Sequence, residues 1–99
     1  MSSSKRQQQP RVPVRMTLFV ADGEANSLRA KQNLARFCEE ELDSNYELKV
    51  VDVLQDFQAA VDHHVMVTPT LIVTEPAPGV AILGDLRDTD RLRAALGLE

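Results

Sequence analysis

The 99-residue sequence contains one cysteine, no tryptophan and only four other aromatic residues. The single Cys38 excludes an intrachain disulfide, a Cys-x-x-Cys redox pair and a zinc site built from several cysteines. Four aromatic side chains are too few for a platform that stacks nucleic-acid bases. No apolar run approaches the roughly 18–20 residues of a membrane span, and the first ten residues lack the apolar segment of a secretory signal. We therefore expect a cytoplasmic protein of one domain without a membrane partner.

Charge is distributed unevenly along the chain. The net charge is −4, from 11 basic and 15 acidic residues, which argues against general binding of DNA or RNA. Residues 1–15 hold four of the basic groups and no acid, namely Lys5, Arg6, Arg11 and Arg15. Because this segment is rich in Ser, Gln and Pro, we expect a disordered basic leader over residues 1–15 and a folded domain over residues 16–99. A basic arm that touches an acidic partner is the alternative function of the leader.

The hydrophobic pattern predicts the element order βαβαββα in a single α/β domain. Strands are expected at residues 16–21, 46–54, 71–74 and 80–83. The first helix should span residues 27–42, with Asn26 and Ser27 supplying its cap; Asp56 should cap a short second helix, and Asp88 or Thr89 the last one. Two parallel strands joined by a helix, followed by a hairpin, form the thioredoxin-like arrangement. In that fold the proline before the third strand is usually cis, and Pro69 occupies this position.

The segment between the first strand and the first helix carries no sulfur. Thioredoxin-like enzymes hold their redox cysteines there, where the helix dipole lowers the thiol pKa. Here the segment is residues 22–27, with the carboxylates of Asp22 and Glu24. Cys38 lies further along, on the apolar stripe of the first helix, where we expect it to be buried. We therefore expect no oxidoreductase activity; the alternative, an enzyme with an unusual thiol, requires an exposed Cys38 with a lowered pKa.

No other motif predicts a catalytic residue, a cofactor site or a metal site. The adjacent His63 and His64 would point about 100° apart on a helix, so they do not converge on one metal ion. We expect exposed or half-buried histidines, with a partner contact as the alternative. The acidic residues 39–41 and Asp43 are typical of a solvated face, or of a surface kept negative for a partner. No phosphate-binding loop and no specific Ser/His/Asp set is present.

Five short segments resemble the KaiB family of circadian clock proteins. They include Val-Asp-Val-Leu and Thr-Pro-Thr-Leu, and they lie in family order at residues 18–21, 26–30, 46–54, 68–71 and 84–86. The resemblance implies a non-enzymatic module that docks on the ring-shaped ATPase KaiC. It also implies two folds, namely a thioredoxin-like state that binds KaiC and a tetrameric state of order βαββααβ in which the C-terminal half is rearranged. The related sensor domain of the clock histidine kinase resembles the same segments.

The resemblance also implies roles for individual residues. Four residues near the start of the first helix and the end of the second are expected to bind the partner, namely Asp22, Asn26, Arg29 and His64. Arg29 matches a family arginine near the ATPase interface, and His64 stands where clock members carry a lysine. Four further residues are expected to determine the fold, namely Pro69, Thr70, Gly84 and Asp85.

Local propensities in the C-terminal half favour the thioredoxin-like state. Residues 71–74, Leu-Ile-Val-Thr, form helix poorly, and residues 91–96 form helix well. Val80 and Ala81 replace two arginines that are common in the family, which makes the fourth strand easier to bury. We therefore predict mainly a thioredoxin-like monomer, with the tetramer as the alternative. A generic thioredoxin-like adaptor or sensor domain, without redox activity and unrelated to KaiC, is the alternative function.

Overall fold

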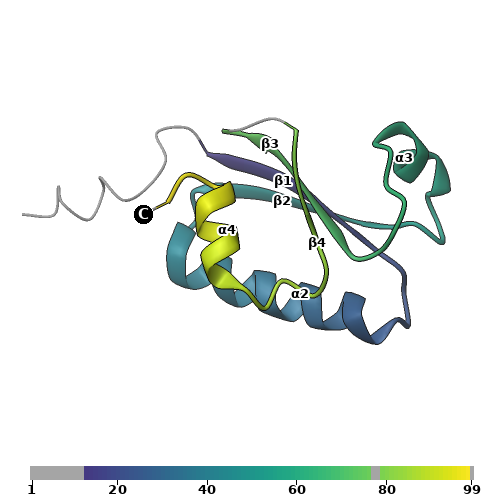
Figure 1. The fold of residues 1–99 in the computed structure, drawn as a ribbon, viewed down its shortest axis with the longest axis horizontal. Helices are drawn as coiled ribbons and strands as arrows, with labels where there is room; N and C mark the ends of the chain where they lie inside the picture. Colours follow the sequence, from purple (N-terminus) through teal and green to yellow (C-terminus); the bar gives the residue numbers. More distant parts are fainter. Residues whose placement is uncertain (1–12, 77–78, 99) are drawn as a thin grey trace, which may run out of the picture.

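The computed structural model describes residues 13–76 and 79–98, which form a four-stranded sheet flanked by helices (Figure 1). The order βαβαββα is confirmed, with the elements β1 (Val14–Val20), α2 (Ala25–Phe37), η1 (Cys38–Leu42), β2 (Tyr46–Asp52), α3 (Phe57–Asp62), β3 (Thr70–Glu75), β4 (Val80–Leu83) and α4 (Thr89–Ala95). Most of the expected leader lies outside the described residues. Its last two positions, Val14 and Arg15, belong to β1, because they pair with Tyr46 and Glu47 of β2.

The sheet has the strand order β2-β1-β3-β4. β1 runs parallel to β2 and antiparallel to β3, and β3 forms an antiparallel hairpin with β4. β1 is therefore an inner strand, which explains why Leu18 and the adjacent Phe19, whose side chains point to opposite faces, are both fully buried. β2 and β4 are the two edge strands.

One face of the sheet carries the main hydrophobic core. Its residues alternate along the strands and recur every three or four positions along the helices, and they include Leu18, Leu34, Leu71, Ile82 and Leu92. α2 and α4 lie on the same side of the sheet and cover this face (Figure 1). The apolar stripe predicted for the first helix, which contains Ala30, Phe37 and Leu42, is confirmed as buried.

The first helix differs from the prediction at both ends. It begins at Ala25 with Glu24 as the N-cap residue, so the cap predicted at Asn26 and Ser27 was wrong. The reason is that the Ser27 hydroxyl bonds to Ala21 and Glu24. At the other end the last five residues form a π-helix, which closes at Asp43 in a left-handed conformation with φ of 49°. Within this turn the Glu41 carboxylate pairs with Arg93 of α4.

The two predicted aspartate caps are confirmed. The Asp56 carboxylate accepts a hydrogen bond from the Ala59 N–H at 3.1 Å, and Asp88 accepts from the N–H groups of Asp90 and Arg91. These bonds satisfy amide groups that have no partner inside the helix. α3 ends at Asp62, so His64 lies beyond the helix rather than on its face, with φ of 58°.

The loop before β3 is held against the end of β4. The Thr68–Pro69 peptide bond is cis. The Gly84 N–H donates to the Pro69 carbonyl at 3.0 Å, and the Thr70 hydroxyl donates to the Val67 carbonyl at 2.7 Å. Gly84 has φ of 106°, a conformation that residues with a Cβ rarely adopt. The structure thus brings together Pro69, Thr70 and Gly84, and their expected role in determining the fold stays a prediction.

Candidate protein-docking site

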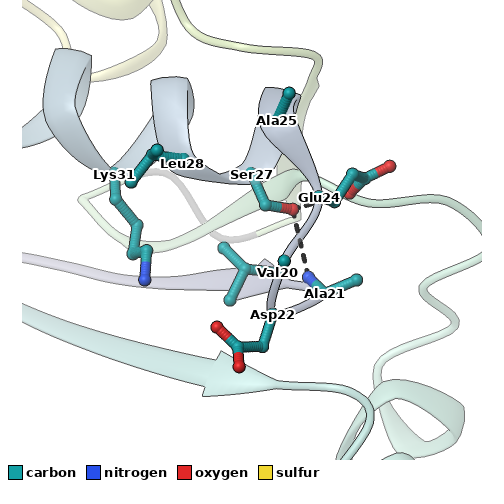
Figure 2. Close-up of a pocket in the computed structure, with 9 residues that line it drawn as sticks. Val20, Ala21, Asp22, Glu24, Ala25, Ser27, Leu28 and Lys31 are labelled. Atoms are coloured by element: carbon teal, nitrogen blue, oxygen red, sulfur yellow. Dashed lines mark hydrogen bonds between the residues drawn. The ribbon is translucent and has the colours of Figure 1, made fainter.

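A chain of hydrogen bonds fixes the connection between β1 and α2. The Ala21 N–H donates to the Ser27 hydroxyl at 3.0 Å, and this hydroxyl donates to the Glu24 carboxylate at 2.7 Å (Figure 2). The same Glu24 oxygen accepts a hydrogen bond from the Thr68 hydroxyl at 3.0 Å. Ser27 is buried inside the helix, where its hydroxyl bonds to Ala21 and Glu24 instead of capping the helix start. The connection is therefore tied to the loop that precedes β3.

A hollow of about 220 Å³ opens at this connection, lined by residues 20–25 together with Ser27, Leu28 and Lys31. It lies where thioredoxin-like enzymes hold their cysteines, yet no sulfur lines it. Figure 2 shows the side chains of Asp22 and Glu24 pointing away from each other, so these two carboxylates do not converge. A paired-carboxylate acid–base arrangement is therefore not formed here.

The only cysteine of the chain is buried. Cys38 is fully buried in the core, and desolvation raises the pKa of its thiol to about 11. A thiol in this environment stays protonated near neutral pH and is a poor nucleophile. The exposed, low-pKa Cys38 that the enzyme alternative requires is therefore not found.

Exposed apolar side chains are concentrated around α3. Eight large apolar side chains are exposed among the described residues, and five of them lie between positions 54 and 67. These five define what we call the α3 surface, namely Leu54, Phe57, Val61, Met66 and Val67. The most exposed are Met66 at 90% and Phe57 at 71%. The periodicity of Phe57, Ala60 and Val61 correctly predicted a helix, but only Ala60 is buried, because α3 lies beyond the end of the sheet (Figure 1).

α3 is anchored by an aromatic contact at its end. The ring of His63 lies 5.3 Å from the ring of Phe19, between centroids, at an interplanar angle of 48°. Phe19 is fully buried although it faces away from α2 and α4. Its contact with His63 therefore holds α3 against the end of β1 and leaves Phe57 and Val61 facing solvent.

The four expected partner-binding residues are all exposed and lie on three segments of the chain. Asp22 lies in the β1–α2 connection, where its N–H donates to the Asp52 carboxylate at 3.2 Å. Arg29 donates to the Asn26 side chain at 2.9 Å on the first turns of α2. His64 follows α3, and no hydrogen bond joins it to Arg29. The structure therefore brings together Asn26 and Arg29, and places Asp22 and His64 on separate loops.

The charge of Arg29 also reaches the loop between β4 and α4. Asp85 in this loop has its pKa lowered from the usual value, chiefly by hydrogen bonding to the Arg87 side chain, with a smaller contribution from the charge of Arg29. The Asn33 side chain donates to the Asp85 carbonyl at 2.9 Å, which joins the same loop to α2. Sequence patterns could not indicate these contacts, because Asn33 and Asp85 are 52 residues apart.

The described residues contain no arrangement for metal chemistry or for crossing a membrane. Within residues 13–76 and 79–98, no three His, Cys, Asp or Glu side chains come together as metal ligands. None of the helices in the same ranges combines the length and the hydropathy that a membrane crossing requires.

These features define a thioredoxin-like domain without the redox cysteine pair. Solved structures agree: mitochondrial thioredoxin 3 of Saccharomyces cerevisiae superposes with a TM-score of 0.71 at 14% identity, over 96% of this chain and 87% of that chain. The N-terminal domain of Synechococcus elongatus SasA superposes with a TM-score of 0.61 at 25% identity, over 86% of this chain and 80% of that chain. The likeness to thioredoxin shows the fold alone.

The sequence comparisons then identify the family. The model of the KaiB domain matches residues 17–98. The circadian clock oscillator protein KaiB of Microcystis aeruginosa is 40% identical over 83 residues, which cover 84% of this chain and 80% of the relative. The circadian clock protein KaiB3 of Synechocystis is 36% identical over 84 residues, which cover 85% and 80%. The chain belongs to the KaiB family, as its sequence resemblance predicted.

Proposed function

We propose that this chain is a non-enzymatic cytoplasmic module that docks on a KaiC-like ring ATPase in circadian or related regulation. The observation that carries the proposal is the α3 surface, where five large apolar side chains lie exposed on one short helix and its flanking loops. Exposed apolar side chains gathered in this way mark interaction sites more often than scattered ones do. Family membership supports a clock-protein partner.

The proposed contact combines the α3 surface with the polar residues beside it. Phe57 and Met66 supply apolar area of the kind that dominates binding energy when a partner covers it. Asp22 and His64 would contribute polar contacts at the rim. Arg29 with Asn26 would extend the contact onto the first turns of α2.

The proposal includes a second fold. The thioredoxin-like arrangement described above would be the docking state, and a rearranged C-terminal half would form the tetramer that the family resemblance implies. Two such states that differ by a few kcal/mol can be repopulated by a partner that binds only one of them. Pro69, Thr70, Gly84 and Asp85 would then favour the docking state.

The proposal is tested by measuring, with biolayer interferometry, how the purified chain binds the KaiC-like ATPase encoded in the same genome. Phe57→Ala should weaken binding about tenfold or more, because a buried aromatic anchor is lost at the interface. Its stability should stay within about 0.5 kcal/mol of the wild type, because the side chain is exposed in the free protein.

Two valines provide a matched comparison. Val61 on the α3 surface and Val50 on β2 are both 47% exposed. Val61→Ala should weaken binding, whereas Val50→Ala should leave it unchanged. Absence of binding by the wild type, or equal effects of the two substitutions, would overturn the proposed docking surface; capture of a partner unrelated to KaiC would favour the adaptor alternative.

A further inference from the structure

β2 presents an open backbone edge. It is an outer strand of the sheet that the described residues form. The Val53 N–H donates to the Val20 carbonyl of β1 at 2.8 Å, and the Asn45 carbonyl accepts from the Val14 N–H at 3.2 Å. Because the direction of these groups alternates along a strand, the N–H and C=O groups of Tyr46, Leu48 and Val50 point away from β1. This edge is a template for pairing with another strand.

The sequence of this edge is complementary to itself. In an antiparallel pair of two copies centred on Leu48, the two Leu48 residues lie opposite each other and exchange both backbone hydrogen bonds. Tyr46 then lies opposite Val50 of the second copy, an aromatic and β-branched pair of the kind that stabilises sheets. Glu47 lies opposite Lys49, and the twofold symmetry repeats each pair.

The charges on this edge fit the same register. Glu47 and Lys49 are both exposed, on the sheet face that α2 and α4 do not cover. Glu47 lies 3.5 Å from the Arg15 guanidinium of the neighbouring strand. Lys49 has no ion pair among the described residues. In the dimer, Lys49 and Glu47 of the second copy would form a non-hydrogen-bonded pair, the type in which the side chains of facing residues lie closest.

The apolar side of the edge is only partly covered in the single chain. Tyr46 and Leu48 are half-buried and pack against the core, and Val50 is exposed. Pairing would remove the remaining apolar area of all three from water. A register centred on Val50 would instead place Leu48 opposite Asp52 and Lys49 opposite Val51, and would lose both charge pairs. Side-chain complementarity therefore selects one register.

We propose that two copies of this chain associate through their β2 strands, antiparallel and centred on Leu48, into one continuous sheet. The association differs from the monomer expected from the sequence and from the rearranged tetramer, because it uses the thioredoxin-like fold unchanged. A contact of one strand per copy is smaller than a stable interface of about 20–30 residues a side, so the dimer is weak and forms at high concentration. It does not use the α3 surface and is independent of the proposed ATPase partner.

Sedimentation velocity of the full chain over a concentration series tests this proposal. The wild type should shift from monomer to dimer below about 1 mM. Lys49→Glu places a carboxylate opposite each Glu47 and should raise the dimer dissociation constant about tenfold or more, because two attractive pairs become repulsive. The double variant Glu47→Lys with Lys49→Glu restores opposite charges in both pairs and should recover the wild-type constant within about threefold.

Arg91→Glu is the matched control. Arg91 is exposed on α4, and this substitution changes the net charge by the same amount as Lys49→Glu without altering β2. It should leave the dissociation constant unchanged. A wild type that stays monomeric up to about 1 mM overturns the proposal, and so does a dimer or tetramer that Lys49→Glu does not weaken or that the double variant does not restore.

Discussion

The hydroxyl of Thr68 donates a hydrogen bond to the carboxylate of Glu24 at 3.0 Å, across 44 positions of the chain. Glu24 is the N-cap residue of α2, and Thr68 precedes the cis-proline. The bond thus joins the start of the first helix to the loop that leads from α3 into β3. It therefore holds the β1–α2 connection against the loop that follows α3.

This bond predicts energetic coupling between the two residues. Thr68→Val should lower the free energy of unfolding by about 1 kcal/mol, since it removes one hydrogen bond to a charged group. Glu24→Ala should cost more, because it also removes the hydrogen bond from the Ser27 hydroxyl. The double variant should cost less than the sum, with a coupling of about 0.5–1 kcal/mol. Urea unfolding of the four proteins measures this cycle, and strictly additive effects would show that the contact contributes nothing to stability.

The burial of α2 predicts a contrast between two leucines on one helix. Leu34 is fully buried, whereas Leu28 is 53% exposed. Leu34→Ala should lower the free energy of unfolding by about 2–5 kcal/mol, because it removes core contacts and leaves a cavity. Leu28→Ala should cost less than about 1 kcal/mol. Chemical denaturation of both variants tests this contrast, and similar losses would contradict the orientation of α2.

The depressed pKa of Asp85 predicts an acid-dependent contribution to stability. Hydrogen bonding to Arg87 lowers the pKa of the Asp85 carboxyl in the folded protein. The ionised carboxylate therefore stabilises the fold above its unfolded-state pKa of about 3.9, and this stabilisation is lost as the pH falls below that value. The urea midpoint of the wild type should therefore fall more steeply below about pH 4 than that of Asp85→Asn. Arg87→Ala should flatten the profile in the same way. If, below about pH 4, the urea midpoint of either variant falls as steeply as that of the wild type, the Asp85–Arg87 pair does not cause the acid dependence.

The raised pKa of Cys38 predicts an unreactive thiol. With a pKa of about 11 and no exposed surface, the side chain is almost entirely protonated and inaccessible at pH 8. Iodoacetamide should therefore modify the native chain more than about a hundredfold more slowly than the urea-unfolded chain. Mass spectrometry over time gives both rates. Equal rates would restore the case for thiol chemistry.

Much of the fold could be predicted because its signals are local. Asp56 and Asp88 act as caps through amides two or three residues away, and the β-branched run at residues 71–74 forms an inner strand. The start of α2 was misplaced because Ser27 bonds to Ala21 and Glu24 rather than to its own helix. Periodicity showed that α3 is a helix, but it could not show that nothing in the described residues covers Phe57.

The candidate site was less predictable, because its contacts are distant in sequence. Resemblance selected Arg29, but its electrostatic effect on Asp85 depends on how α2 lies against the β4–α4 loop. The spacing of Glu24 and Ser27 resembles a reversed capping box and could have indicated their bond. Nothing local indicated Thr68 as the further partner of Glu24.

The proposed docking state depends on a C-terminal half that folds as a hairpin followed by a helix. Backbone-assigned NMR of the free chain tests it most directly, through the secondary chemical shifts of its last two strands and last helix. We expect extended shifts across β3 (Thr70–Glu75) and β4 (Val80–Leu83), and helical shifts across α4 (Thr89–Ala95). Helical shifts at residues 71–74 together with extended shifts after Asp88 would contradict it.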